Sequence, residues 1–302
     1  MNTKPVFHGS DIEKICEYYH LNQEDIVNFG ANVNPIGIST HVKQVLASHL
    51  DLLSSYPDRD YQSLRNTVSE YCGVPADYVL PGNGSSELIS LLIETRAPKR
   101  TLLLGPTYSE YSRELSLSNS KCNEFLLKET DEFILNVDFL CQSLLAGSYD
   151  FLIICNPNNP TGTVVDSEEL KEFIHKVPKD IIIVVDEAYI ELSSNPDVKS
   201  MVSEISDDTN VVVARTFSKL YGLAGVRLGY AMCNKEMHAI LQKCTSVFTG
   251  SRVALAGAMA ALDDEEYIKR QKQQCLRAEN ILLMNLQKWD FTYILPRQIS
   301  FM

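Results

Sequence analysis

Short apolar runs alternate with helical patterns between about residues 64 and 260. Helical periodicity is clear at Ser167–Lys176, where Asp166 and Ser167 form an N-cap signal and acidic residues follow in the first turn. Strands that alternate with helices predict an α/β fold with a mostly parallel sheet between layers of helices. The predicted strands are aliphatic or β-branched almost throughout, as expected when helices cover both faces of the sheet: Thr101–Leu104, Phe151–Cys155, Ile181–Val185 and Val211–Ala214.

The two ends of the chain fall outside this alternation, which predicts an uneven division into domains. We expect residues 1–45 and those after about residue 260 to form a smaller domain or a flanking layer. Residues 46–258 would form the large, ligand-binding domain. The acidic run Asp263–Glu266 is interpreted as a solvated helix start.

Composition narrows the class of protein. The chain has 302 residues, 45% hydrophobic and 22% charged, and a net charge of −12. That charge argues against nucleic acid or an anionic membrane surface as a partner. The eight cysteines are scattered without a C-x-x-C pair, which is typical of a reducing compartment and not of a disulfide framework or a metal site. The first residues lack a signal peptide's apolar core, and no run approaches a membrane span, so we expect a cytoplasmic protein.

Lys219 stands in a polar turn directly after the run Val211–Ala214, and Arg227 follows eight residues later. A lysine can form an imine with an aldehyde, while an arginine and the hydroxyls of Thr216 and Ser218 suit a phosphate. An aldehyde on a phosphorylated ring describes pyridoxal 5′-phosphate. A lysine in a turn is more often only solvated, so the ends of the other strands decide between the two interpretations.

Polar motifs follow two further predicted strands. The turn Asn156–Gly162, with two prolines, is either a stiff loop or a rigid support that holds the Asn159 amide toward a ring oxygen. Asp186 ends an apolar run and either caps the next turn or faces a pyridine nitrogen, whose protonated form its charge would favour. Tyr189, three residues later, could reach the phenolic oxygen of the same ring.

Two upstream motifs could complete such a site. A glycine turn feeds a helix at Gly84, Ser85 and Ser86, and the unpaired N–H groups of a helix start bind phosphate. Tyr108 follows the run Thr101–Leu104, where it could stack on a ring or lie in the core. Because ligands of parallel sheets bind beyond the carboxyl ends of the strands, we expect all these side chains at one edge.

Together the motifs resemble those of the fold-type I pyridoxal-phosphate enzymes, within them the histidinol-phosphate aminotransferase and threonine-phosphate decarboxylase group. The opening Phe7–Ser10 and the segment Phe29–Gly37 are more similar to the decarboxylase branch. The run Thr216–Gly225 is more similar to the histidinol-phosphate branch. The resemblance rests on Gly82–Ile89, Asn156–Gly162, Val185–Glu191 and Arg215–Tyr230, and it extends over nearly the whole chain.

The resemblance implies a homodimer with a shared active site and roles for individual residues. Lys219 would be the imine lysine and proton carrier, and Asp186 would pair with the ring nitrogen. The remaining roles implied are contact with the ring oxygen (Asn159, Tyr189), stacking (Tyr108), phosphate binding (Gly84, Ser85, Ser86, Thr216, Ser218, Arg227), contact with the neighbouring subunit's phosphate (Tyr56) and contact with the substrate (Asn32).

One departure from the pattern concerns the substrate. The resemblance implies that residues 1–45 form an N-terminal arm and part of a small α+β domain, and that residues 259–302 form the incomplete start of the C-terminal small domain. The family continues past residue 302 and carries there an arginine that binds the substrate α-carboxylate. No arginine of this chain matches that motif; those nearest the end are Arg252, Arg270, Arg277 and Arg297.

Three functions therefore stay open: an aminotransferase of a small phosphorylated amino acid, a decarboxylase of O-phosphothreonine, and a cofactor-binding protein with little or no catalysis. A hydrolase or nucleotide-binding protein is disfavoured because G-x-S-x-G, P-loop and G-x-G-x-x-G motifs do not occur.

Overall fold

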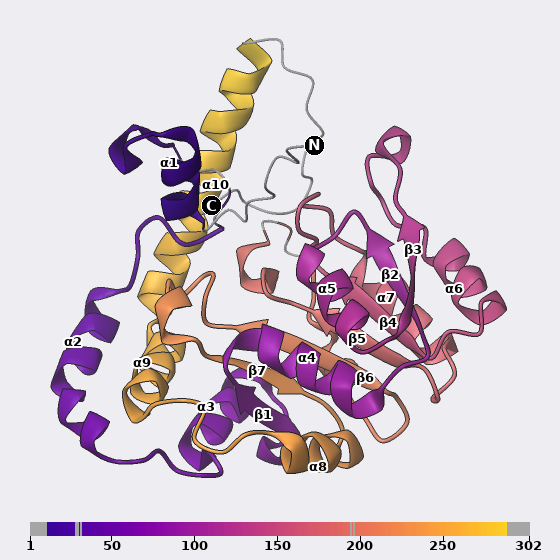
Figure 1. Cartoon of the computed structure of the whole chain (residues 1–302), viewed down its shortest axis with the longest axis horizontal. Helices are drawn as coiled ribbons and strands as arrows, with labels where there is room; N and C mark the ends of the chain where they lie inside the picture. Colours follow the sequence, from indigo (N-terminus) through magenta and orange to yellow (C-terminus); the bar gives the residue numbers. More distant parts are fainter. Residues whose placement is uncertain (1–10, 28–29, 31, 194, 196, 289–302) are drawn as a thin grey trace.

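One seven-stranded sheet forms the centre of the molecule in the computed structural model, which describes residues 11–27, 30, 32–193, 195 and 197–288. The strand order is β1-β7-β6-β5-β4-β2-β3 (Figure 1). Strands β3, β2, β4, β5 and β6 run parallel to one another, whereas β7 is antiparallel to both β6 and β1. The bounds are β1 Val79–Gly82, β2 Arg100–Gly105, β3 Lys121–Leu126, β4 Phe151–Cys155, β5 Ile182–Asp186, β6 Val211–Thr216 and β7 Gly229–Met232. The predicted α/β class with a mostly parallel sheet is confirmed.

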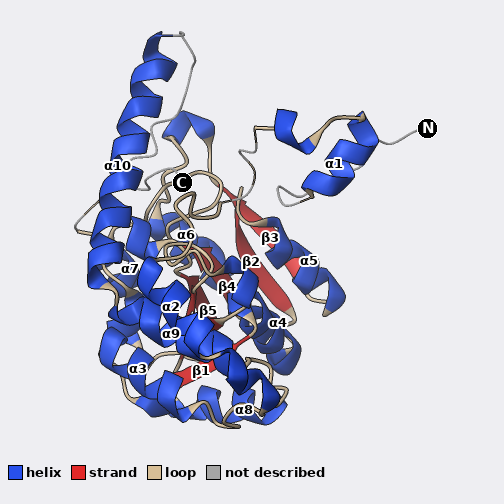
Figure 2. Ribbon diagram, turned by 90° about the vertical axis from the view of Figure 1, so that its left-hand side faces the viewer, coloured by secondary structure: helices blue, strands red, loops and turns tan. Residues whose placement is uncertain are grey.

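Helices surround this sheet, and α10 projects beyond the rest of the fold (Figures 1 and 2). Helix α7 has the predicted bounds, and Asp166 caps it by accepting from the N–H groups of Glu168 and Glu169. The predicted start of a helix after Asp263 is also confirmed, because Asp264 accepts from the N–H of Tyr267 in the first turn of α10. The helices are α1 Ile12–Tyr19, α2 Thr40–Ser48, α3 Gln62–Cys72, α4 Gly84–Arg96, α5 Ser109–Leu117, α6 Val137–Ala146, α7 Ser167–Lys176, α8 Lys235–Cys244, α9 Arg252–Asp263 and α10 Glu265–Lys288.

The sheet separates two apolar cores, because successive side chains of each strand point to opposite faces of the sheet. Leu103, Ile153 and Val184 face one core, which includes buried residues of α4, α5 and α8. The neighbouring strand positions, such as Ile154 and Val185, face the other core, to which α3, α6, α7 and α9 contribute. Burial on both faces explains why these strands are apolar without alternation in the sequence. Their parallel direction places their carboxyl ends at one edge of the sheet.

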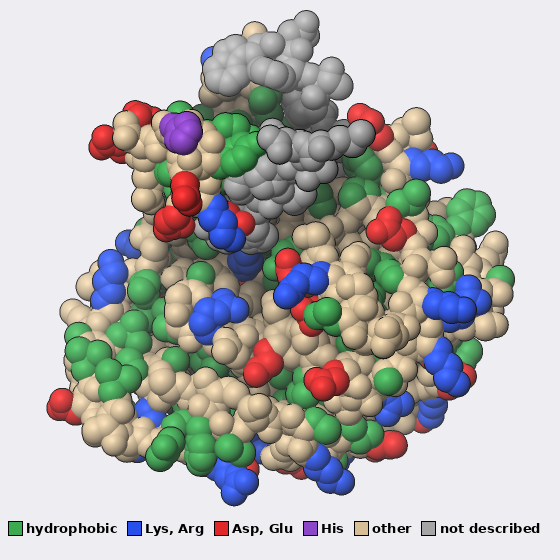
Figure 3. Space-filling model, viewed as in Figure 1, with side chains coloured by type: hydrophobic (Ala, Val, Ile, Leu, Met, Phe, Trp, Pro, Cys, Tyr) green, Lys and Arg blue, Asp and Glu red, His purple; other side chains and the backbone are tan. Residues whose placement is uncertain are grey.

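The predicted division into domains stays a prediction. Some residues named in the sequence analysis lie outside the described residues: Phe7–Ser10, Phe29, Ala31 and Arg297. No helix of the described part is both long and apolar enough to cross a membrane. On the face shown in Figure 3, Lys and Arg side chains are interspersed with Asp and Glu side chains.

Candidate active site

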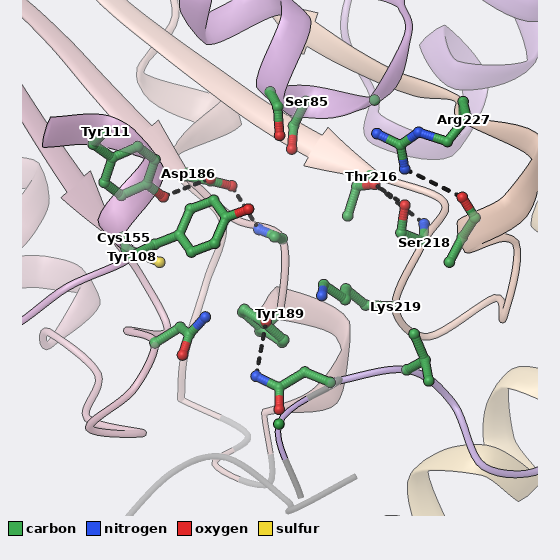
Figure 4. Close-up of a pocket in the computed structure, with 18 residues that line it drawn as sticks. Ser85, Tyr108, Tyr111, Cys155, Asp186, Tyr189, Thr216, Ser218, Lys219 and Arg227 are labelled. Carbon is green, nitrogen blue, oxygen red and sulfur yellow. Dashed lines mark hydrogen bonds between the residues drawn. The ribbon is translucent and has the colours of Figure 1, made fainter. Parts of the chain in front are cut away.

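A cavity of about 270 Å³ lies at the carboxyl ends of β4, β5 and β6 and at the first turn of α4 (Figure 4). All the site residues predicted from the sequence line it except Tyr56. They are Asn32, Gly84, Ser85, Ser86, Tyr108, Asn159, Asp186, Tyr189, Thr216, Ser218, Lys219 and Arg227. The structure thus brings together motifs that are up to 195 residues apart, from position 32 to position 227.

One corner of the cavity, here called the anion corner, has groups that suit an anion: the start of α4 at Gly84, Thr216, Ser218 and Arg227. Helix α4 begins at Gly84, whose φ of 76° lies in the left-handed region, and the helix start directs its N–H groups toward the corner. A Cβ on Gly84 would lie 2.9 Å from Nη2 of Arg227. Thr216 donates its hydroxyl proton to Ser218 Oγ at 3.0 Å and accepts from the Ser218 N–H at 3.1 Å. Helix-start amides, two hydroxyls and a guanidinium therefore converge (Figure 4).

Lys219 reaches the cavity from the turn that follows β6. Its burial lowers the pKa of the ammonium group below the usual range, and the positive charge of Arg227 acts in the same direction, while Asp186 opposes them. The ammonium nitrogen lies 5.2 Å from the ring centre of Tyr189. A lysine with a lowered pKa is neutral more often at neutral pH, and the neutral amine is the nucleophilic form.

Asp186 ends β5 with its carboxylate held from two sides. Tyr111 donates to Oδ2 at 2.6 Å, and the N–H of Ala188 donates to Oδ1 at 3.1 Å. Because only 5% of Asp186 is exposed, burial raises the pKa of its carboxyl group, although both hydrogen bonds and Lys219 act against this. The result is a fixed, nearly dry acidic group facing a cavity that also contains an amine.

Aromatic residues form another wall. Tyr108 meets Tyr111 edge to face, with ring centres 5.4 Å apart and an interplanar angle of 85°. Burial raises the pKa of Tyr108, and the charges of Glu110 and Asp186 add to the increase. The hydroxyl of Tyr189 accepts from Nδ2 of Asn32 at 3.1 Å, while burial raises the pKa of this phenol. Both phenols therefore stay protonated at neutral pH.

Asn158 fixes the turn between β4 and α7, because its side chain binds both the turn itself and the loop that follows β2. Its Oδ1 accepts from Thr107 at 2.8 Å, and its Nδ2 donates to the carbonyl of Pro106 at 3.0 Å and to Thr161 at 2.7 Å. The neighbouring Asn159 is left to line the cavity. The turn is therefore stiff, as one interpretation predicted, and its support of the Asn159 amide toward a ring oxygen stays a prediction.

The sequence did not predict every residue of the cavity. Tyr111 follows Tyr108 by three residues, and this helical spacing was a signal that both tyrosines share a face. Cys155 is buried as expected for a core residue, but it also lines the cavity. Burial, helped by the charge of Asp186, raises the pKa of the Cys155 thiol to about 12, so it stays protonated. Further residues of the lining that were not predicted are Gly30, Val33, Ala188 and Ala224.

Tyr56 lies apart from the cavity. It is 80% exposed, and its ring centre is 5.0 Å from that of Phe248. Its expected contact with a second subunit stays a prediction.

The cations of the cavity, among the described residues that line it, are Lys219 and Arg227. Arg252 instead donates to Ser55 at 3.0 Å, and Arg270 lies over the ring of Tyr267.

Comparison with known proteins shows the family to which this chain belongs. The sequence model described as aminotransferase class I and II matches residues 24–301. The histidinol-phosphate aminotransferase of Anoxybacillus flavithermus is 32% identical over 277 residues, which are 90% of this chain and 71% of that protein.

Two solved structures share the fold. The histidinol-phosphate aminotransferase of Sinorhizobium meliloti in complex with pyridoxal-5′-phosphate has a TM-score of 0.81 at 22% identity, covering 92% of this chain and 74% of that one. The L-threonine-O-3-phosphate decarboxylase of Porphyromonas gingivalis has a TM-score of 0.76 at 22% identity, covering 87% and 77%. With a family model over most of its length and a relative above 30% identity, the chain belongs to the aminotransferase class I and II family.

Proposed function

We propose that the chain is a pyridoxal-phosphate-dependent aminotransferase that acts on a small phosphorylated amino acid, of the kind handled by the histidinol-phosphate branch. The observation that carries the proposal is the meeting of Lys219, Asp186 and the anion corner in one cavity. An aldehyde, a ring nitrogen and a phosphate are the three features of this cofactor that such groups recognise. The family membership and the name of the relative support the same chemistry.

The residues present fit the cofactor. The glycine at position 84 lets the Arg227 guanidinium lie close to the start of α4, because a Cβ there would lie 2.9 Å from Nη2. The proposed phosphate contacts are Gly84, Ser85, Ser86, Thr216, Ser218 and Arg227. Tyr108 would stack on the ring, Asp186 would face the ring nitrogen, and Asn159 and Tyr189 would bind the ring oxygen.

When bound, pyridoxal phosphate supplies an electron sink for the carbon next to the substrate nitrogen. Asp186 would hold a proton at the ring nitrogen, because a fixed carboxylate in a dry site favours the positively charged ring. Lys219 would bind the cofactor covalently at rest and would carry the proton during the transfer. Its lowered pKa suits that task, since a proton carrier works best when its pKa lies near the operating pH.

The partner subunit is also part of the proposal. We place Tyr56, with its exposed ring, at the phosphate site of a second copy in a homodimer, as the resemblance implies. Asn32, which donates to Tyr189, would meet the substrate from the chain's own side.

Decarboxylation of O-phosphothreonine is the second candidate. The N-terminal motifs Phe7–Ser10 and Phe29–Gly37 favour it, while the likeness to the decarboxylase structure extends to the fold alone. Both reactions use the same cofactor, and the bond that breaks is the one held perpendicular to the ring by contacts with the substrate.

The test is to incubate the purified, cofactor-loaded protein with histidinol phosphate or threonine phosphate and an oxo acid, and to identify the products. We expect amino-group transfer from histidinol phosphate. Carbon dioxide release from threonine phosphate would select the second candidate, and no product from either substrate would leave cofactor binding as the function.

A further inference from the structure

A buried polar cluster joins the turn that carries Lys219 to two distant segments. Its centre is Asn34, which is 6% exposed. The Asn34 Nδ2 donates to the carbonyl of Leu220 and to the hydroxyl of Tyr267, both at 2.7 Å. The Asn34 Oδ1 accepts from the N–H of Ile36 at 2.9 Å and from Nε2 of Gln271 at 2.6 Å. An amide has two N–H donors and two acceptor sites, so the capacity of Asn34 is fully used.

The partners belong to three parts of the chain. Leu220 follows Lys219 directly, Ile36 lies in the N-terminal segment, and Tyr267 and Gln271 are residues of α10. Tyr267 is 5% exposed and Gln271 is 1% exposed, and Tyr267 also donates to the carbonyl of Gly37. The cluster is therefore shielded from water, where its hydrogen bonds are strong and a lost partner is costly.

Direct backbone contact strengthens this junction. Gly222 has a φ of 69°, and a Cβ on it would lie 2.7 Å from the carbonyl oxygen of Gly37. The Lys219 turn and the N-terminal segment thus touch without side chains between them. Two residues before Asn34, the side chain of Asn32 donates to Tyr189 in the cavity, and Val33 lines the cavity itself.

We propose that Asn34 is a positioning residue: it fixes residues 32–37 and 219–222 in one arrangement and so sets where Asn32 and Lys219 stand relative to each other. Helix α10 is the third member of the junction. Its hydrogen bonds to Asn34 therefore affect the two walls of the cavity that Asn32 and Lys219 form. The expected effect of this arrangement on substrate binding rests on the proposed aminotransferase function. Asn34 itself does not line the cavity.

The test compares Asn34→Ala and Tyr267→Phe with Asn234→Ala as a matched control. Asn234 is also 6% exposed, and its side chain binds the carbonyl of Thr209 at 3.0 Å and the N–H of Met237 at 2.9 Å. It follows β7, whose first residue Gly229 pairs with Thr216 near the cavity. The control therefore removes an equally buried amide at the opposite end of the strand.

The main readout is native-state hydrogen exchange on the full, cofactor-loaded chain. Suitable probes are the amides of Gly37, Gly222 and Leu223, which are hydrogen-bonded to Asn34, Lys219 and Phe217. We expect Asn34→Ala to speed their exchange by about tenfold or more relative to amides of β4 and β5, with a smaller effect of the same pattern in Tyr267→Phe. Asn234→Ala should not single out these amides.

Kinetics give a second readout. The KM for the phosphorylated substrate should rise in Asn34→Ala and Tyr267→Phe, with a smaller change in kcat, because Asn32 loses its fixed place. An exchange pattern equal to that of the control in both variants would overturn the proposal. If Asn34→Ala does not fold, Tyr267→Phe decides. Because exchange needs no turnover, failure of the proposed function and failure of this inference are distinguishable.

Discussion

Replacing Asp186 with asparagine removes the charge of the side chain and keeps its shape. The new side chain can hold both present partners: its oxygen can accept from the N–H of Ala188, and its NH₂ can donate to the Tyr111 hydroxyl, which can reverse its role. The fold and the anion corner should therefore stay intact. What is lost is the negative charge, in a position where only 5% of the residue is exposed and charge acts strongly.

The expected loss is in turnover. Removing one preorganised electrostatic partner from a dry active site costs about 3–5 kcal/mol of transition-state stabilisation, or roughly 10²- to 10⁴-fold in kcat. Affinity for the cofactor should fall much less, because the phosphate contacts remain. The assay is steady-state kinetics with a cofactor titration by absorbance.

The thermal stability of Asp186→Asn, unlike its turnover, should increase near neutral pH. Burial raises the pKa of Asp186 in the folded protein, so its ionised form is disfavoured by folding. A raised pKa contributes stability that is present below the unfolded pKa and lost as the pH rises through the folded value. Without cofactor, Asp186→Asn should therefore have a higher Tm than the wild type near neutral pH, and the difference should vanish in acid.

The matched control is Asp166→Asn, because asparagine caps a helix as well as aspartate does. It should turn over substrate at nearly the wild-type rate. An unchanged kcat in Asp186→Asn would refute the proposal that Asp186 faces the ring nitrogen of the cofactor. A lower Tm near neutral pH together with a lower kcat would point to a merely structural role.

Three further predictions concern the cofactor and the dimer. Borohydride reduction of the loaded protein, followed by peptide mass mapping, should place the label on Lys219; label on another lysine would contradict the assignment. Gly84→Ala should weaken cofactor binding by roughly tenfold or more, because its φ is 76° and the new Cβ would meet Arg227 at 2.9 Å. Gly225→Ala, with nothing within 4 Å of its Cβ, should leave the dissociation constant nearly unchanged, and equal effects would exclude the proposed crowding. Inactive Tyr56→Ala and Lys219→Ala proteins should regain activity when mixed, since a mixed dimer has one intact site; no recovery would argue against a shared site.

The four central strands could be predicted from sequence because burial on both faces leaves an unbroken apolar run. The other three could not. β1 contains Pro81 and Gly82, which are poor strand formers, and Pro81 is tolerated because β1 lies at the sheet edge. β3 is the opposite edge and is mostly exposed, so Lys121–Leu126 shows no apolar run. β7 has four residues and begins with glycine.

The cavity residues could be predicted where they stand directly after a strand, since strand ends meet at one edge. Their roles came from the resemblance to the family. The comparisons confirm the family and the fold, and the roles of the individual residues stay predictions. Tyr111 and Asn34 were missed because their importance depends on partners far along the chain. Tyr111 binds a residue 75 positions away, and Asn34 binds one 186 positions away. The spacing of Tyr108 and Tyr111 indicated a shared helix face, but no local pattern indicates which distant residue Tyr111 or Asn34 binds.

The most direct test of amino-group transfer follows the nitrogen itself. Histidinol phosphate labelled at its amino nitrogen is incubated with the cofactor-loaded protein and an unlabelled oxo acid, and mass spectrometry follows the label. The account predicts that the label appears in the amino acid formed from the oxo acid, and that Lys219→Ala abolishes this transfer. An active, loaded protein that leaves the label on its substrate and instead releases carbon dioxide from threonine phosphate would contradict it.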